Sequence, residues 1–360
     1  MPVLTLERPP AITLRRPAAR PAAAGPARPF ATLPVGRQLA RIEQLARQAL
    51  PLYGLPSASE IRLLNYSENA TWLIRPPGGP ARVLRINRPG YHPRANIASE
   101  LEWVLAIRRD TPIITAGPIP ALDGEYIQHI WHPGVPEPRN CVLFTFVEGS
   151  EPDESNRRAA FELLGEVTAR LHAHVVSWKP SRPMRRFRWD FDTMLGPAGH
   201  WGRWQQGTGV TPAIQRHLAR TIPVLRRRSG AIGFTKNRFG LIHADLRAAN
   251  LLVKDGAVAA IDFDDCGYSW FIYDLASALS FIEMTPEAPA LIDAWLRGYS
   301  KIRALSKTEI AAIDTFVMMR RLLLLAWIGS HADTAQAQTV APGYAEGTAA
   351  LADRYLSRLS

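Results

Sequence analysis

Residues 241–265 read LIHADLRAANLLVKDGAVAAIDFDD, and this stretch carries the clearest local signal in the chain. Asp255 and Gly256 lie between two apolar runs. This is a strong signal for a two-residue β-hairpin, because a type I′ turn needs positive φ at both central positions. Such a turn places Asn250 opposite Ile261 and beside Asp262. The sequence therefore predicts that an amide oxygen and a carboxylate meet at one end of the hairpin.

Three polar side chains of this stretch suit phosphoryl transfer. Asn250 and Asp262 offer the oxygen ligands that Mg²⁺ prefers, and we predict that they bind the metal. Asp245 lies five residues before Asn250, within reach of the same place, and is predicted to orient an attacking hydroxyl and accept its proton. Kinase-type transfer needs such a set, because the protein mainly positions the phosphoryl group and neutralises its charge. The stretch therefore predicts ATP and Mg²⁺ as cofactors.

Other side chains near this stretch have a simpler interpretation. Asp264 and Asp265 could add to metal binding or bind a cationic substrate, and for Asp265 we favour a solvated loop position. The aromatic residues of 189–192 and 201–204 could line a substrate cleft, but packing is the default for such residues.

Upstream of the stretch, residues 37–147 predict a small lobe built on a sheet. Apolar residues recur at helical spacing in 36–50 and 95–109. Strand-like runs are separated by polar turns and lie at 61–64, 70–74, 81–86, 126–131 and 141–147. The order of helix, three strands, helix and two strands predicts a five-stranded antiparallel sheet with a helix packed on it.

After Glu148 and Gly149 the pattern becomes mostly helical, and residues 148–360 predict a larger lobe. Helices are predicted at 154–177, 211–228, 271–283, 287–300, 307–331 and 343–358. The fold class is therefore α+β, with a small antiparallel β-sheet lobe and a larger, mainly helical catalytic and substrate lobe. Residues 1–36 are rich in Pro, Ala and Arg with little apolar periodicity, which predicts a disordered tail.

The composition is that of a soluble globular protein, with 47% hydrophobic and 21% charged residues among 360. The longest apolar run, 322–328, is too short to span a bilayer, so no membrane contact is expected. The start lacks an apolar signal segment and the chain has only two cysteines, which predicts a cytoplasmic location. The formal charge of +11 includes basic clusters at 185–188 and 226–228. We interpret them as solvated faces, because no nucleic-acid motif accompanies them.

The motifs resemble the phosphotransferase superfamily of aminoglycoside phosphotransferases, choline kinases and homoserine kinases, nearest to its bacterial stress-response kinases. The resemblance covers residues 37–360 in element order and is most specific at 240–280. Residues 164–172 are similar to the family's L-G-x-x-x-A-x-L-H helix motif, and 273–276 to its Y-D-L-A segment. The resemblance implies a two-lobed, protein-kinase-like fold. It also implies that Asp274 braces the catalytic loop and that His243 is a packed residue that fixes the backbone.

The resemblance also implies a nucleotide site in the small lobe. Arg85 stands where the family has a phosphate-binding lysine, and an arginine can make bidentate phosphate contacts. Glu100 is the implied partner of that cation, with Glu102 as the competing choice. Ser67 and Asn69 are implied to lie in the turn that covers the phosphates. The backbone groups of Thr145 and Val147 are implied to bind adenine, with Phe144 behind the ring.

The spacing of the motifs favours a small acceptor over a protein. Eleven residues separate Asp262 from Asp274, no A-P-E follows, and no arginine directly precedes Asp245. A peptide therefore lacks a long activation segment on which to lie. The expected substrate is a small hydroxyl-bearing molecule such as an aminoglycoside, an amino alcohol or a homoserine-like compound. The alternatives are a stress-response-type Ser/Thr protein kinase and a weakly catalytic nucleotide-binding regulator.

Overall fold

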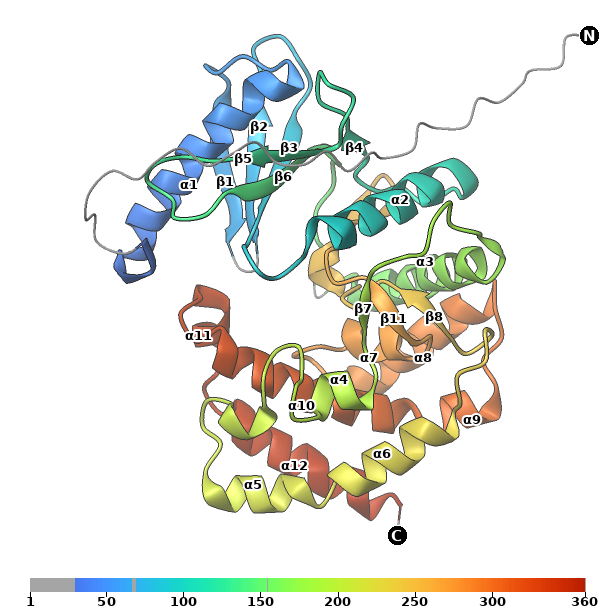
Figure 1. The fold of residues 1–360 in the computed structure, drawn as a ribbon. Coiled ribbons are helices and arrows are strands. Elements are labelled where there is room, and N and C mark those ends of the chain that lie inside the picture. The colour runs from blue at the N-terminus through green and yellow to red at the C-terminus, as the bar shows by residue number, and fades with distance from the viewer. Residues whose placement is uncertain (1–29, 67–68, 154, 360) are drawn as a thin grey trace, which may run out of the picture. The chain divides into compact units, whose positions relative to one another are not determined.

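The computed structural model describes residues 30–66, 69–153 and 155–359, so most of the predicted tail and the predicted turn residue Ser67 lie outside the described residues. The chain divides into two compact units. The first comprises residues 1–98 and 117–146, and the second comprises 99–116 and 147–360. Figure 1 shows an antiparallel sheet in the first unit and many helices in the second, which confirms the predicted α+β fold class.

The first unit is built on a six-stranded antiparallel sheet. Its strands are β1 Glu60–Tyr66, β2 Asn69–Arg75, β3 Arg82–Asn87, β4 Pro118–Ile119, β5 Ile127–Ile130 and β6 Arg139–Thr145. The order is β1-β2-β3-β6-β4, and β5 also pairs with β6. The predicted count of five missed β4, because two residues that begin with a proline give no periodic signal.

Helix α1, Val35–Ala49, packs its apolar side on this sheet. Ile42, Leu45 and Ala46 are buried in one cluster with strand residues that include Trp72 and Leu84. Two short 3₁₀ helices, η1 Phe30–Thr32 and η2 Leu50–Tyr53, flank α1. The chain then continues through α2, Arg94–Asp110, whose first residues belong to this unit and whose later residues belong to the second.

The second unit is mainly helical. Its helices after α2 are α3 Arg157–Ser177, α4 Phe191–Leu195, α5 Pro212–Ala219, α6 Ile222–Ala231, α7 Tyr273–Ala278, α8 Ala288–Ser300, α9 Lys307–Ile310, α10 Ile313–Ser330, α11 Ala335–Val340 and α12 Tyr344–Ser357. Two predictions of single helices, 211–228 and 307–331, were wrong, because each region forms two. Pro223 lies in the first turn of α6, where its missing N–H costs nothing, and it could not continue α5.

Helices α3 and α8 pack backbone against backbone. A Cβ atom on Gly298 would lie 1.8 Å from the Glu162 carbonyl oxygen, and one on Gly165 would lie 2.0 Å from that of Trp295. Only glycine fits both positions, and this close approach explains the glycine of the motif at 164–172. The packing also fixes the end of α3 that carries His172.

Short strands in the second unit hold the site. β8 Phe239–Ile242 and β7 Phe187–Arg188 flank β11 Gly267–Trp270, while β9 Leu251–Lys254 and β10 Ala257–Ala260 form a separate hairpin. Two more 3₁₀ helices, η3 Trp204–Gln206 and η4 Ala248–Asn250, lie in this unit. Within the ranges that the structure describes, no helix is long and apolar enough to cross a membrane.

Candidate active site

The β9–β10 hairpin has the predicted geometry. Lys254 pairs with Ala257 across the turn, and Asp255 and Gly256 have φ of 50° and 77°. The register continues to the strand ends, where the Ile261 N–H donates to the Asn250 carbonyl oxygen at 3.0 Å. Asn250 therefore lies opposite Ile261, with Asp262 directly after it, which confirms the predicted register.

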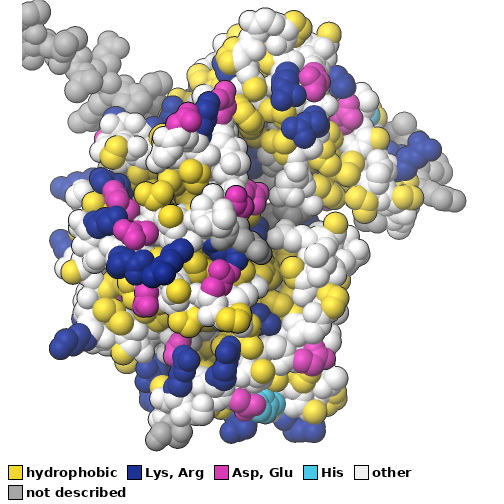
Figure 2. All heavy atoms as spheres, turned by 180° about the vertical axis from the view of Figure 1, so that it is seen from behind, with side chains coloured by type: hydrophobic (Ala, Val, Ile, Leu, Met, Phe, Trp, Pro, Cys, Tyr) yellow, Lys and Arg dark blue, Asp and Glu magenta, His cyan; other side chains and the backbone are white. Residues whose placement is uncertain are grey.

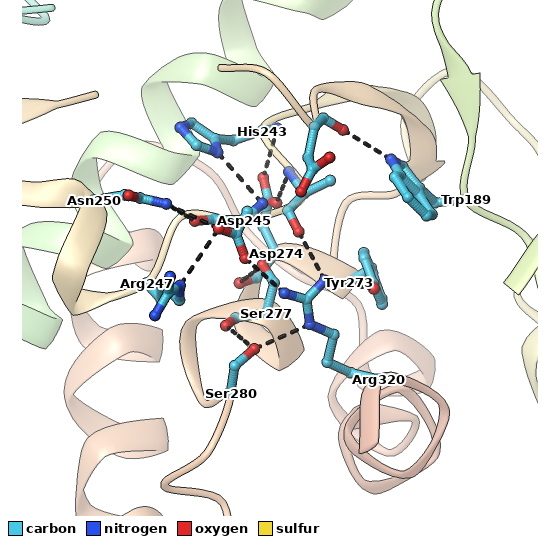
Figure 3. A network of polar contacts seen from close by, with 12 residues as sticks. Trp189, His243, Asp245, Arg247, Asn250, Tyr273, Asp274, Ser277, Ser280 and Arg320 are labelled. Carbon is cyan, nitrogen blue, oxygen red and sulfur yellow. Dashed lines mark hydrogen bonds and ion pairs between the residues drawn. The ribbon is translucent and has the colours of Figure 1, made fainter. Parts of the chain in front are cut away.

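Asp245 and Asn250 contact one another in the loop between β8 and β9. The Asn250 side-chain nitrogen donates to the Asp245 carbonyl at 2.8 Å and to its carboxylate Oδ2 at 2.9 Å. Arg247 Nε donates to the same Oδ2 at 3.4 Å, and Arg320 Nη2 donates to Oδ1 at 2.6 Å (Figure 3). Since its nitrogen is used in this way, the oxygen of the Asn250 amide is the atom that can serve as a metal ligand.

Asp274 holds the backbone just before Asp245. Its buried carboxylate accepts the N–H groups of Ala244 at 2.8 Å and His243 at 3.3 Å, and His172 Nε2 donates to it at 3.0 Å. Ala244 has φ of 65°, a conformation that costs a non-glycine residue free energy, and the carboxylate offsets that cost by binding both amides. These contacts have the geometry expected of the predicted brace.

His243 joins the catalytic loop to the end of the hairpin. Its ring Nε2 donates to the Ile261 carbonyl at 3.0 Å, and its Nδ1 accepts the Asp245 N–H at 3.3 Å. These partners assign the proton of the neutral ring to Nε2. Burial lowers the pKa of His243, against the opposing charges of Asp274 and Asp245, which favours the neutral ring. These contacts have the geometry expected of the packed, backbone-fixing role that the resemblance implies for His243.

Asp262 begins the loop after the hairpin and is exposed, with φ of 62°. Arg186 holds the backbone of this loop, because its guanidinium donates to the carbonyls of Asp264 and, at 2.7 Å, Cys266. The solvated-face interpretation was wrong for Arg186, which is buried because these carbonyls provide partners for its donors. Burial acts to lower the pKa of Arg186, but the nearby charges of Cys266 and then Glu100 raise it.

The two carboxylates after Asp262 differ in exposure. Asp264 is buried, and Asp265 is only partly exposed. The Asp265 carbonyl accepts from Trp189 Nε1 at 2.8 Å, which ties the backbone of the loop. Asp265 therefore occupies a partly solvated loop position, which is close to the favoured interpretation.

Arg320 is the site residue that sequence reasoning missed. It lies in α10 within an apolar run, where periodicity indicates core, and its side chain is 4% exposed. A charge in such a run is itself a signal, since buried charges are paired. Its neighbour Arg321 is paired elsewhere, with Glu283 and with Thr348 Oγ1.

In the first unit, Arg85 is buried on β3 with its guanidinium 5.1 Å from the centre of the Phe144 ring. Asn69 Oδ1 accepts from the Asn87 side chain at 3.2 Å. Thr145 is tied to the chain at Gly117 by two hydrogen bonds of 2.8 Å. Val147, which already belongs to the second unit, is partly exposed. The nucleotide contacts of these residues, and of Glu100 in the second unit, stay predictions.

Glu102, the competing partner for the phosphate-binding cation, is engaged within the second unit. Its carboxylate accepts the N–H of Ser181 at 2.7 Å and pairs with Arg182 Nε at 3.2 Å. These contacts use both carboxylate oxygens, so Glu100 remains our choice.

The donor set at the hairpin end suits a hard divalent cation. Among the described residues, no group of three or more His, Cys, Asp or Glu side chains could hold a metal ion. Mg²⁺ is usually held by one or two protein oxygen ligands together with phosphate oxygens and water. An amide oxygen from Asn250 and a carboxylate from Asp262 fit that pattern.

Residues 60–310 match the model of the phosphotransferase enzyme family. The chain belongs to this family. A solved structure of a microcompartment-associated aminopropanol kinase is 40% identical with a TM-score of 0.81, covering 88% of this chain and 98% of that one. The amicoumacin kinase of Bacillus subtilis (strain 168) is 25% identical over 299 residues, which is 78% of this chain and 83% of the relative.

A third similar protein is the amicoumacin kinase hAmiN, solved in complex with AMP-PNP, Ca²⁺ and Ami. It is 20% identical with a TM-score of 0.70, and the match covers 86% of this chain and 94% of that one. At this identity the likeness shows the fold. Together with the family match, these comparisons establish the phosphotransferase as an enzyme of the kinase type with a hydroxyl acceptor.

The charged side chains on one face of the molecule are of mixed sign. On the face that Figure 2 draws, Lys and Arg side chains are interspersed with Asp and Glu. Ion pairs between exposed side chains show the same mixing of sign: Arg226 pairs with Asp192 at 2.7 Å, and Arg358 pairs with Asp314 at 2.8 Å. Such mixed charge is typical of a solvated face, whereas nucleic-acid binders gather one sign on a patch.

Proposed function

We propose that this phosphotransferase moves the γ-phosphate of ATP to the hydroxyl of a small amino alcohol, with Mg²⁺ as the metal. The observation that carries the proposal is the contact between Asp245 and Asn250 at the hairpin end where Asp262 follows. The Asp245 carboxylate contacts the Asn250 amide, and Asp262 follows the residue paired with Asn250. This supports the division between a proton acceptor and metal ligands that kinase-type transfer uses.

The chemical step follows from these positions. A bond forms between the acceptor oxygen and the γ-phosphorus, the bond from that phosphorus to the bridging oxygen breaks, and ADP leaves. The hydroxyl proton passes to Asp245 and then to solvent, leaving a phosphate monoester. Asn250 and Asp262 would hold Mg²⁺, which when bound neutralises phosphate charge. Arg85, Glu100, Ser67, Asn69, Thr145 and Val147 are our proposed nucleotide contacts.

A strand between Asp262 and Asp274 supports a small acceptor. Gly267–Trp270 forms β11, which pairs with β8 over four residues and with β7 over two. In a protein kinase, the segment at this place would need to bind the peptide. Here it is part of a buried sheet. This argues for a small molecule over a Ser/Thr-containing protein.

The similarity to an aminopropanol kinase supports an amino alcohol as the first acceptor to test. That protein is 40% identical and matched over 98% of its length, whereas the amicoumacin kinase of Bacillus subtilis is 25% identical. Homoserine and an aminoglycoside complete the panel, because both carry an amine and a hydroxyl.

The test is acceptor-dependent release of ADP from MgATP, with 1-amino-2-propanol, ethanolamine, homoserine and spectinomycin as acceptors. We expect turnover with an amino alcohol, loss of turnover on chelation of the metal, and loss in Asp245→Asn with nucleotide binding retained. Asp255→Asn is the matched control, because it changes a carboxylate at the exposed hairpin turn and asparagine tolerates positive φ. Equal turnover in wild type and Asp245→Asn would refute the assignment.

A further inference from the structure

Arg320 is a buried cation with four different partners. Besides Asp245 Oδ1, its Nε donates to Ser280 Oγ at 3.0 Å, and its Nη1 lies 3.2 Å from the Tyr273 hydroxyl and 3.3 Å from the Ala244 carbonyl. The guanidinium carbon lies 5.4 Å from the centre of the Trp201 ring. Figure 3 shows the side chain reaching from α10 into the polar network.

These contacts define the direction of the Asp245 carboxylate. Arg320 holds Oδ1 from one side, and Asn250 holds Oδ2 from the other at 2.9 Å. A carboxylate bound at both oxygens by donors from separate elements has one allowed rotamer. A reacting group misplaced by about 1 Å can lose about 100-fold in rate, so this constraint has a direct consequence for catalysis.

Arg320 also joins the loop of Asp245 to α7. It contacts Ala244 and Asp245 in the loop after β8, and Tyr273 and Ser280 at the two ends of α7. Only the planar guanidinium offers donors in several fixed directions, so a lysine would meet one or two of these partners. The cation therefore connects the loop with the proton acceptor to the helix that carries Asp274.

We propose that Arg320 is a positioning residue for phosphoryl transfer: it sets the rotamer of Asp245 and ties the loop of Asp245 to α7. This inference rests on the proposed function, because it assigns Asp245 the contact with the acceptor hydroxyl. Arg320 itself acts through Asp245 and needs no contact with either substrate.

The chain offers a matched control at the next position of the same helix. Arg321 is as buried as Arg320 and also has an acidic partner, Glu283, but its other bonds go to Thr348 and to the Tyr344 carbonyl. Loss of Arg321 removes a buried ion pair without touching Asp245. Any difference in turnover between Arg320→Gln and Arg321→Gln thus reports on Asp245 rather than on the burial of charge.

The experiment compares kcat and KM of wild type, Arg320→Gln, Arg320→Lys and Arg321→Gln below their unfolding temperatures. We expect Arg320→Gln to lose about 100-fold in kcat while KM for ATP and for the acceptor stays near wild type. Arg320→Lys should recover part of the loss, and guanidinium ion should raise the turnover of Arg320→Ala but not of Arg321→Ala. Equal kcat in Arg320→Gln and Arg321→Gln would overturn the proposal.

A second readout needs no turnover and separates this inference from the proposed function. The unfolding temperatures of Asp245→Asn, Arg320→Gln and the double variant form a cycle. If the two side chains are coupled, the double variant loses less than the sum of the single losses. Additive losses would contradict the positioning role even in an active enzyme. Coupled losses in a protein without acceptor-dependent turnover would contradict only the proposed function.

Discussion

Replacing Asp274 with asparagine tests how the catalytic loop is held. Asp274 accepts three hydrogen bonds, from Ala244, His243 and His172, and its exposed fraction is 1%. Asparagine keeps one oxygen, which can still accept the closest of them, from Ala244 at 2.8 Å. Its NH₂ group then meets the His243 N–H, so two donors oppose one another without water.

The magnitude follows from these bonds. A hydrogen bond to a charged acceptor contributes about 2 kcal/mol, and a buried donor left unsatisfied costs a further 1–3 kcal/mol, on the order of 4 kcal/mol together. The strained backbone at Ala244 keeps its own bond but loses the support of the neighbouring His243 amide. For a folding unit of about 200 residues, we expect the unfolding temperature to fall by roughly 10 °C. Turnover should fall too, since Asp245 follows Ala244 directly.

Asp110→Asn is the control, and both variants are measured by thermal unfolding followed by circular dichroism. Asp110 accepts from His174 Nε2 at 3.1 Å, two residues along α3 from His172, but its side chain is 32% exposed. A pair in which the carboxylate keeps this much contact with water contributes about 1 kcal/mol or less. Equal small losses in both variants would refute the bracing role of Asp274.

Three further outcomes are expected. Gly298→Ala should lower the yield or the unfolding temperature markedly, because its Cβ would lie 1.8 Å from a carbonyl oxygen. Gly230→Ala is the control and should be neutral or stabilising, because open space surrounds that position. Similar unfolding temperatures of the two variants would contradict the close packing. Burial lowers the pKa of His172 below its ordinary 6.5, with Asp274 opposing. The unfolded chain therefore binds more protons than the folded chain below that pH, so the free energy of unfolding should fall from pH 7 to 5.5. The fall should be less steep in His172→Gln. Parallel pH profiles of the two proteins would show that His172 does not cause the fall. Asn250→Ala should raise the Mg²⁺ concentration for half-maximal turnover by at least about tenfold, measured by metal titration, and an unchanged value would remove Asn250 as a ligand.

The parts of the site that follow from local chemistry were predictable. Asp255 and Gly256 specify a type I′ turn, and the turn alone sets the register of Asn250 against Ile261. The strand periodicity of the first unit likewise gave five of its strands to within about two residues at each end. In these cases the signal and the structure lie within a few residues of one another.

The missed parts depend on contacts between distant residues. Arg320 lies 75 positions from Asp245, and Arg186 lies 80 from Cys266, so no local pattern connects them. Both stand in segments whose local pattern indicates something else, an apolar helix and a basic cluster. The sequence gives one signal for both: a charged residue that, once buried, must be paired. Only the fold identifies the partner.

Product analysis by ³¹P NMR tests the central claim most directly. With MgATP and 1-amino-2-propanol, wild-type protein should form ADP and one new phosphomonoester in equal amounts, and Asp245→Asn should form neither while it still binds the nucleotide. ADP accompanied only by inorganic phosphate, or ester formed equally fast by Asp245→Asn, would contradict the account.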